Sequence, residues 1–471
     1  MLTDDEYQKH LKKVSEEINE VSPSFCVAKW KQVTMHLHNG HTHSCHHPKT
    51  HLIPIEEIKR NPKALHNTEF KKLQRRMMLE GRRPPECDYC WRVEDSGNEL
   101  SDRVIKSADT SWAYGHIDEI AMTPWNKDVD PSYVEISFSS VCNFKCSYCG
   151  PSVSSQWMEE IERYGAYPTS NKFNNLQWLK QQKEIPIPNN QDNPYVDAFW
   201  EWFPNMYQNM RQFRITGGEP LLSKNTFRVL DYIIENPNPN LVFSVNTNLN
   251  PPPELLDKFI EKLKIIQEKK CVERVHLFTS AEAHGKQAEY IRYGLNYNDW
   301  LNNLERIIKE VPEIAFTIMS TYNILSITTF DKFLKDILDL RLKYREQALA
   351  NFRTPIMVNI PYLRYPDHQA AYIVTQEFLP YIDRQIKFME DNIEQGHIEG
   401  HESFTGFHEH EIYKLKNIRD IIVAELENPT DKSILRKDFT TFVDEHDRRR
   451  GTNFLETFPE MENIYKEWKL L

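Results

Sequence analysis

Three cysteines lie close together in the chain, at Cys142, Cys146 and Cys149. The thiolates of such a short loop can each bind a different iron atom of a four-iron cluster. Because the loop has no fourth cysteine, one iron would be left without a protein ligand, and an open iron can take part in chemistry. A fully ligated cluster would normally transfer electrons only. A zinc-binding loop is the alternative interpretation of this spacing.

A second group of four cysteines precedes this loop: Cys26, Cys45, Cys87 and Cys90. The last two have the C-x2-C spacing at which two thiolates converge on one metal ion or cluster. Four thiolates can form a structural zinc site or a fully ligated iron–sulfur cluster, and the residues alone leave both open. The same segment contains several histidines: His36, His38, His41, His43, His46 and His47. With four cysteines available, we expect these imidazoles to support the ligands or to lie at the surface rather than to bind metal.

The size and charge of the chain limit what it can be. Its 471 residues, 39% hydrophobic and 12% aromatic, can form two or three domains with a sizeable core. The net charge of -11 argues against a general nucleic-acid binder. The first residues lack the apolar core of a signal peptide, and no apolar run is long enough to cross a membrane. We therefore expect a cytoplasmic protein with neither membrane nor nucleic-acid partners, whose cysteines are reduced ligands rather than disulfides.

Downstream of residue 131, short apolar runs alternate with stretches of helical periodicity, a pattern typical of parallel βα units. The predicted strands cover residues 133–139, 212–216, 241–246, 275–280, 315–322 and 356–361. Helical periodicity is clear over residues 254–266 and 330–342. The sequence therefore predicts an α/β fold with six parallel strands.

Active groups of a parallel barrel collect at the carboxyl ends of its strands, so the residues after each strand are informative. After the second strand, Gly217 and Gly218 allow a backbone to approach a ligand closely, and Glu219 can hold an ammonium group. After the fourth strand, Ser280 and Glu282 are two residues apart and point to the same side, where both can reach a ribose.

Taken together, these motifs resemble the radical S-adenosylmethionine (SAM) superfamily. Its cysteine loop reads C-x3-C-x-aromatic-C, and Tyr148 stands at the aromatic position. Its Gly-Gly-Glu-Pro motif, which binds the amino group of SAM, is similar to residues 217–220. Six βα units resemble its partial barrel. The resemblance implies a 4Fe-4S cluster on Cys142, Cys146 and Cys149, with SAM bound at the open iron.

Further residues are assigned to SAM by the same resemblance. Asn248 follows the third strand, where the family often has Thr-Asn-Gly, although Leu249 replaces the glycine here. Ser280 and Glu282 are similar to a Ser-x-Asp ribose position, and Arg292 resembles an arginine that neutralises the SAM carboxylate. The predicted cofactor-binding residues are Tyr148, Gly217, Gly218, Glu219, Asn248, Ser280, Glu282 and Arg292.

The earlier cysteines resemble a twitch or SPASM-type auxiliary-cluster module, which implies a second 4Fe-4S cluster on Cys26, Cys45, Cys87 and Cys90. Such modules more often follow the barrel, whereas this one precedes it. The expected architecture is an N-terminal Cys-rich auxiliary-cluster domain (residues 1–115), a partial (β/α)6 radical SAM barrel (116–366) and a helical C-terminal region (367–471). The polar stretch 169–194 is expected to cap the barrel mouth or to be a disordered spacer.

The remaining charged and reactive residues have ordinary interpretations. The basic triplet Arg448–Arg450 is expected to lie on a solvated face. Cys271 precedes the fourth strand, at the end opposite the expected site, so a buried or idle thiol is favoured over a hydrogen-atom donor. No catalytic acid, base or hydrogen donor can be identified.

The resemblance implies an enzyme that reductively cleaves SAM to a 5′-deoxyadenosyl radical, which abstracts a substrate hydrogen atom. We expect a peptide or protein substrate, because the insertion and the helical tail offer surface for a chain. A small sugar or amino-alcohol is the alternative, and an electron-transfer or sensing protein without turnover is the alternative of another class. A reducing partner such as flavodoxin or ferredoxin is implied.

Overall fold

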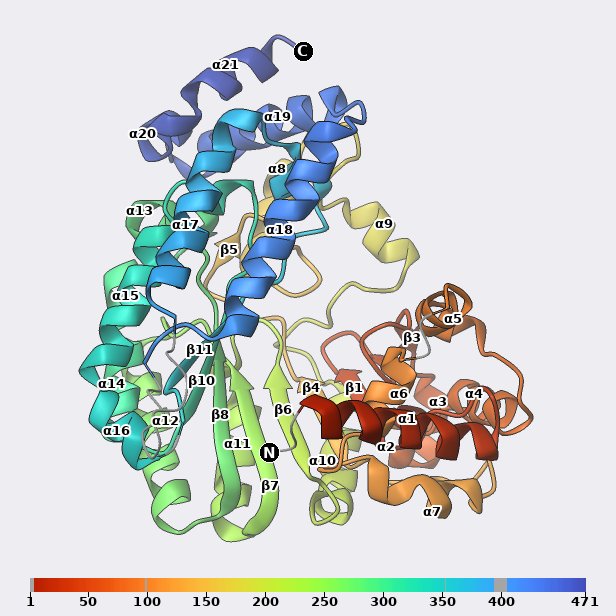
Figure 1. Ribbon diagram of the computed structural model, residues 1–471. Coiled ribbons are helices and arrows are strands. Elements are labelled where there is room, and N and C mark those ends of the chain that lie inside the picture. Colours follow the sequence, from red (N-terminus) through yellow and green to blue (C-terminus); the bar gives the residue numbers. More distant parts are fainter. Residues whose placement is uncertain (1–3, 98–99, 352, 394–404) are drawn as a thin grey trace.

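All six predicted strands form, and they lie side by side in one sheet (Figure 1). The computed structural model describes residues 4–97, 100–351, 353–393 and 405–471. The strands are β4 (Tyr133–Ser137), β6 (Gln212–Thr216), β7 (Asn238–Asn246), β8 (Val272–Thr279), β10 (Ala315–Met319) and β11 (Ile356–Asn359). Each is parallel to its neighbours in this order. The predicted parallel α/β arrangement is therefore confirmed.

The two faces of this sheet differ in burial. In β6, Phe213 and Ile215 are fully buried, whereas the alternate residues Arg214 and Thr216 are partly exposed. The buried face packs in one core with the connecting helices α11 (Lys224–Glu235), α12 (Pro253–Glu268), α14 (Tyr297–Glu310) and α15 (Phe330–Lys343). Because successive side chains of a strand point to opposite faces, the alternation leaves an inner face that is less buried and carries polar side chains.

The N-terminal segment adds strands to the same sheet. Strand β1 (Gln32–His36) pairs in parallel with β4, and β2 (His41–His43) and β3 (His51–Leu52) continue the sheet in antiparallel fashion. Among the described residues the sheet has nine strands, in the order β11-β10-β8-β7-β6-β4-β1-β2-β3. The N-terminal helices are α1 (Asp4–Val21), α2 (Ala28–Lys31), α3 (Ile55–Arg60), α4 (Glu69–Leu79), α5 (Asp88–Asp95), α6 (Asp102–Ser107) and α7 (Ile117–Ala121). All of them except α3 enclose a smaller core that includes Phe25, Trp30 and Trp91, whereas Ile58 of α3 packs in the main core. The boundary near residue 115 stays a prediction.

The insertion between the first two barrel strands follows α8 (Ser155–Tyr164), contains α9 (Leu176–Gln181) and precedes α10 (Pro194–Tyr207). It contacts two parts of the chain: the Asn174 side chain donates to Cys149 O (3.0 Å) in the cysteine loop, and Ile187 N donates to His38 O (2.7 Å) just after the N-terminal strand at residues 32–36. These contacts favour the capping interpretation over a spacer.

The C-terminal region is helical, as expected. It contains α17 (Leu379–Asp391), α18 (Glu409–Glu427), α19 (Ser433–Arg450), α20 (Phe454–Thr457) and α21 (Glu462–Lys469). In Figure 1 these helices extend beyond the carboxyl ends of the strands. The solvated-face prediction is right for Arg448, whose side chain is 56% exposed, but wrong for Arg449 and Arg450, whose side chains are 1% and 0% exposed. Arg450 is buried because α19 packs against the cysteine loop, where Glu160 provides a counter-ion.

A fully buried ion pair joins the C-terminal region to the barrel. The guanidinium of Arg341, on α15, contacts both carboxylate oxygens of Glu411, on α18, at 2.7 and 3.3 Å. It also donates to Ile356 O, and Glu411 accepts from Val358 N. Both side chains are 0% exposed, so removal of one partner leaves an uncompensated buried charge.

We predict that Arg341→Leu lowers the free energy of unfolding by about 3–5 kcal/mol, because Glu411 remains buried without its cation. Urea unfolding followed by circular dichroism measures the change. Lys335→Ala, which removes one partner of an exposed pair with Asp339 on the same helix, is the control and should unfold at the same urea concentration as the parent. Equal stability of the two variants would contradict the prediction.

Candidate functional site

The cysteine loop follows β4 at the carboxyl end of the sheet. Its short strand β5 (Lys145–Cys146) pairs with β9 (Arg292–Tyr293), and Cys146 lies opposite Arg292. Burial, followed by the neighbouring Cys146, raises the pKa of the Cys149 thiol to about 12. Burial and the same neighbour also raise the pKa of Cys142. The three thiols therefore lie within electrostatic reach of one another, and positive iron would stabilise them as thiolates.

The Gly-Gly-Glu turn packs directly against the start of this loop. Glu219 N donates to Val141 O (2.7 Å), and Gly218 N donates to Ser139 O (3.2 Å). A Cβ on Gly218 would lie 2.2 Å from Val141 O, and Gly217 has a φ of +128°. Neither position tolerates a side chain. The glycines thus permit the approach of two protein backbones, a structural reason that adds to the predicted approach of a ligand.

Glu219 links the ends of β6 and β7. Its Oε1 accepts from Leu221 N (3.0 Å) and Thr247 Oγ1 (2.8 Å), and its Oε2 accepts from Asn248 N (2.6 Å). Burial raises the pKa of Glu219 to about 7. The Asn248 side chain in turn donates to Asn143 Oδ1 (2.8 Å) in the cysteine loop. The structure thus brings Glu219 and Asn248 to the loop, and their roles toward SAM stay predictions.

Three further predicted residues form one buried cluster. Arg292 Nε donates to Glu282 Oε2 (2.9 Å), and Arg292 also donates to Tyr148 Oη (2.5 Å). Tyr148 Oη lies 3.2 Å from Glu282 Oε1. Arg292 is 3.6 Å from Cys146 Sγ. Glu282 therefore already has a protein cation, and a SAM carboxylate would have to share Arg292. Ser280 lies nearby in sequence and is partly exposed.

The inner face of the sheet carries charged residues that the sequence reasoning missed. Glu135 on β4 lies opposite Arg214 on β6 in the strand register, and their charged atoms are 4.0 Å apart. Arg214 donates to Asn246 Oδ1 (2.8 Å), and its guanidinium lies 4.0 Å from the Phe278 ring centre. His276 on β8 donates to or accepts from Thr317 (2.8 Å). The sequence does contain a signal for this face, because polar residues alternate with apolar ones along the predicted strands.

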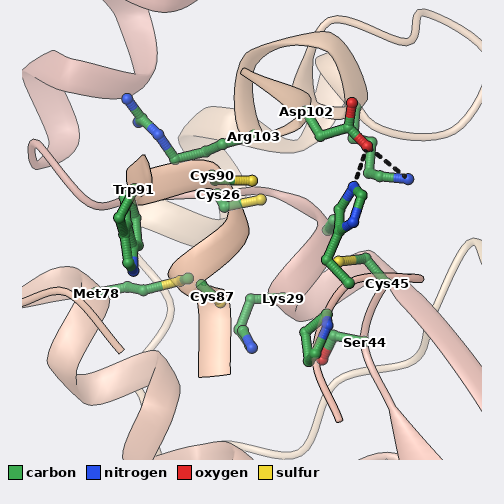
Figure 2. A pocket seen from close by; sticks show the side chains of 14 residues that line it. Cys26, Lys29, Ser44, Cys45, Met78, Cys87, Cys90, Trp91, Asp102 and Arg103 are labelled. Atoms are coloured by element: carbon green, nitrogen blue, oxygen red, sulfur yellow. Dashed lines mark hydrogen bonds and ion pairs between the residues drawn. The ribbon is translucent and has the colours of Figure 1, made fainter. Parts of the chain in front are cut away.

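The four N-terminal cysteines line one small pocket (Figure 2). Cys26 lies just before α2, Cys45 follows β2, and Cys87 and Cys90 lie at the start of α5. Burial, together with the charges of the other three thiols, raises the pKa of Cys90 to about 12. In the described residues, no three His, Cys, Asp or Glu side chains converge tightly enough to hold a single metal ion. A zinc ion needs four ligand atoms within about 2.3 Å, whereas a four-iron cluster separates its thiolates by binding each to a different iron.

Cations and histidines surround this pocket. Lys29, only 2% exposed, pairs with Glu86, and Arg103 pairs with Glu94 (2.8 Å). His47 contacts Asp102 at 2.5 Å, and His43 bonds to Cys45 O. The histidines therefore contact protein groups around the cysteines in the structure, and the expectation that they do not bind metal stays a prediction. Cys271 is fully buried just before β8, which confirms the prediction of a buried thiol.

The comparisons with known proteins agree with this geometry. Residues 136–340 match the family model of the radical SAM superfamily. This part of the chain contains the cysteine loop, the Gly-Gly-Glu turn and Arg292, and the match supports a radical SAM enzyme with a 4Fe-4S cluster and SAM. A comparison with curated proteins gave no match. In the part of the chain that the structure describes, no helix combines the length and apolar character needed to cross a membrane.

We predict that the two cysteine groups bind iron independently. Cys146→Ala should remove about four iron atoms per chain after anaerobic reconstitution, and Cys87→Ala should remove about four others. Iron and zinc analysis of the purified variants measures the loss. Cys271→Ala, which changes a buried thiol outside both groups, should keep the full iron content. Four iron atoms and one zinc in the parent protein would instead identify the N-terminal group as a zinc site.

Proposed function

We propose that this chain is a radical SAM enzyme that abstracts a hydrogen atom from a peptide or protein substrate. The observation that carries the proposal is the packing of the Gly-Gly-Glu turn against the three-cysteine loop, through the Glu219 N to Val141 O bond (2.7 Å). When bound, the cluster would supply one electron that cleaves SAM to methionine and a 5′-deoxyadenosyl radical. The protein would orient SAM and the substrate and exclude water from the radical.

The residues at the carboxyl ends of the strands would bind SAM. The backbone of Gly217 and Gly218 and the Glu219 carboxylate would bind its ammonium group, and Asn248 would stabilise that turn. Arg292 would pair with the SAM carboxylate, which its five N–H donors permit beside the existing Glu282 contact. Ser280 and Glu282 would face the ribose, and Tyr148 would orient Glu282 and Arg292.

A second 4Fe-4S cluster of the twitch or SPASM type would be bound by Cys26, Cys45, Cys87 and Cys90. The mutual proximity of the four thiols supports this assignment. The buried cations Lys29 and Arg103 beside them would balance the negative charge of a thiolate-bound cluster. With four cysteine ligands this cluster would relay electrons rather than bind substrate. A flavodoxin or ferredoxin in the cytoplasm would act as the reductant.

Two features favour a peptide over a small metabolite. A cavity of about 800 Å³ lies between the cysteine loop and the insertion, lined in part by Tyr148, Cys149, Trp178 and Tyr365. Trp178 is 54% exposed and Tyr365 is 70% exposed, so both offer aromatic surface to a partner, as residues of interfaces commonly do. The charged inner face of the barrel could contact polar side chains of such a substrate.

We predict that the anaerobically reconstituted and reduced protein converts SAM to 5′-deoxyadenosine slowly even without substrate. Chromatography with mass spectrometry measures this product. The Cys142→Ala variant, which lacks one ligand of the open cluster, should form none. If the parent protein binds its iron, is fully reduced and still forms no 5′-deoxyadenosine, the enzyme proposal is wrong and an electron-transfer or sensing protein is favoured.

The substrate class is tested by the fate of the abstracted atom. We predict that 5′-deoxyadenosine acquires deuterium when the protein is incubated with the intact peptide and protein fraction of cells grown on deuterated medium. Substrate deuterium bonds directly to the 5′ carbon, so the mass of the product reports it. The unlabelled fraction is the control. Deuterium transfer from the small-metabolite fraction alone would contradict the peptide proposal.

A further inference from the structure

Arg450 is the last residue of α19 and lies more than one hundred residues beyond the segment that matches the superfamily. The helix stops there because Gly451 adopts a left-handed conformation, with a φ of +68°. The side chain of Arg450 is 0% exposed, although the neighbouring Arg448 is 56% exposed. A fully buried guanidinium at a helix terminus requires specific partners.

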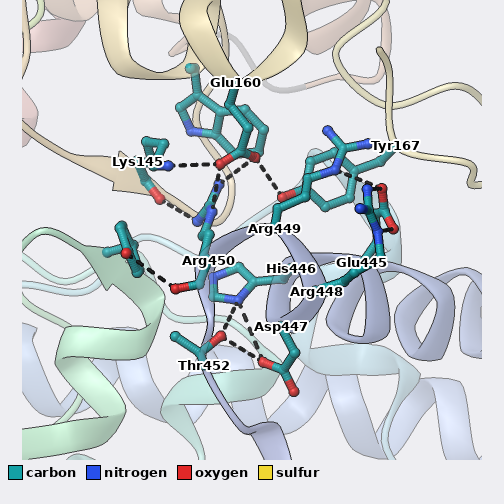
Figure 3. Close-up of polar contacts among 12 residues, drawn as sticks. Lys145, Glu160, Tyr167, Glu445, His446, Asp447, Arg448, Arg449, Arg450 and Thr452 are labelled. Atoms are coloured by element: carbon teal, nitrogen blue, oxygen red, sulfur yellow. Dashed lines mark hydrogen bonds and ion pairs between the residues drawn. The ribbon is translucent and has the colours of Figure 1, made fainter. Parts of the chain in front are cut away.

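Those partners lie on the cysteine loop and on the helix that follows it (Figure 3). Arg450 donates to both carboxylate oxygens of Glu160, at 3.0 and 3.2 Å, and to Lys145 O at 2.7 Å. Its guanidinium also lies 4.6 Å from the ring centre of Trp157, whose Nε1 donates to Cys146 O (2.8 Å). Arg450 therefore binds the carbonyl of Lys145, and the indole of Trp157, on which Arg450 packs, binds the carbonyl of Cys146.

The backbone of Arg450 contacts β9, the strand that pairs with β5. Tyr293, which pairs with Lys145 between β5 and β9, donates from its hydroxyl to Arg450 O (3.2 Å). One turn earlier on α19, Asp447 accepts from Tyr290 Oη (3.0 Å). The end of α19 thus contacts both strands of the two-stranded sheet, β5 and β9, that contains Cys146.

Two cations share one carboxylate at this contact. Arg450 and Lys145 both pair with the single carboxylate of Glu160, which is only 2% exposed on its side chain. Asp447, at the same end of α19, is a further acidic group nearby. A negatively charged iron–sulfur cluster on Cys146 and its neighbouring thiolates would be stabilised by the nearby buried guanidinium of Arg450.

We propose that Arg450 is a positioning residue of the iron–sulfur site, which fixes the Lys145–Cys146 backbone and makes the cluster easier to reduce. Reduction adds negative charge, and a nearby buried cation stabilises the more negative state. The C-terminal region would therefore form part of the cofactor site rather than a separate appendage. This inference rests on the proposed function, because it assumes a SAM-binding cluster on Cys142, Cys146 and Cys149.

Three variants of the full-length protein test the proposal: Arg450→Gln, Arg450→Lys and, as the matched control from the same triplet, Arg448→Gln. After anaerobic reconstitution, the retained cluster and its midpoint potential are measured by electron paramagnetic resonance. The signal that changes on addition of SAM identifies the cluster with the open iron and separates it from the N-terminal one. Thermal unfolding of each variant is recorded in parallel.

We expect Arg450→Gln to retain the SAM-responsive cluster in a smaller fraction of chains and to shift its midpoint potential to more negative values. Arg450→Lys keeps the charge but cannot form the bidentate contact. It should therefore retain the cluster in fewer chains, with little change in the midpoint potential. Arg448→Gln should match the parent protein in both. If Arg450→Gln fails to fold, the test depends on Arg450→Lys. A fraction of cluster-containing chains equal to that of the parent protein overturns the proposal, and a smaller fraction supports it.

Two negative results have different meanings. A parent protein without any SAM-responsive signal overturns the proposed function and this inference with it. A parent protein with that signal, whose retention and potential are unchanged in Arg450→Gln, overturns the inference alone.

Discussion

The close approach of the Gly218 backbone to Val141 is the contact on which the candidate site depends. The cysteine loop has almost no regular structure of its own, apart from the two-residue strand β5. It cannot hold three thiols in a common direction unless other segments hold it. The glycine turn does so at the start of the loop, where a Cβ would lie 2.2 Å from Val141 O. The turn also ends in Glu219, so one contact brings together the predicted cluster and SAM residues.

Other segments support the rest of the loop, and each comes from a different part of the chain. Strand β9, which contains Arg292, pairs with the strand of Cys146. The insertion contacts Cys149 O through Asn174, and α19 contacts Lys145 O through Arg450. Backbone carbonyls of the loop are thus bound by side chains from distant elements. An irregular loop with this many attachments can be rigid, because its conformation is determined by the surrounding fold rather than by its own backbone hydrogen bonds.

The sequence predicted the parallel strands well because each is a short apolar run between helices, and local pattern reports burial directly. It also identified the cysteine loop and the glycine turn, whose spacing carries chemical meaning. It did not predict that β1 would join the barrel sheet, since strand pairing over about one hundred residues leaves no local signal. Arg450 was misjudged for the same reason: a basic triplet after acids is typical of a solvated face, and its partner Glu160 lies 290 positions away. Glu135 and Arg214 were missed because they lie within the strands, whereas the site residues were predicted from the positions that follow the strand ends.

The pairing of β1 with β4 has a consequence for how the two cysteine groups are connected. Five consecutive residue pairs, from Gln32 with Tyr133 to His36 with Ser137, join the two strands. The spacing between Cys45 and Cys142 is therefore set by a hydrogen-bonded ladder and not by a flexible linker. Any electron passing between the two groups would cross a fixed distance. A shortened chain without β1 would leave β4 as an unprotected sheet edge, prone to associate with other copies.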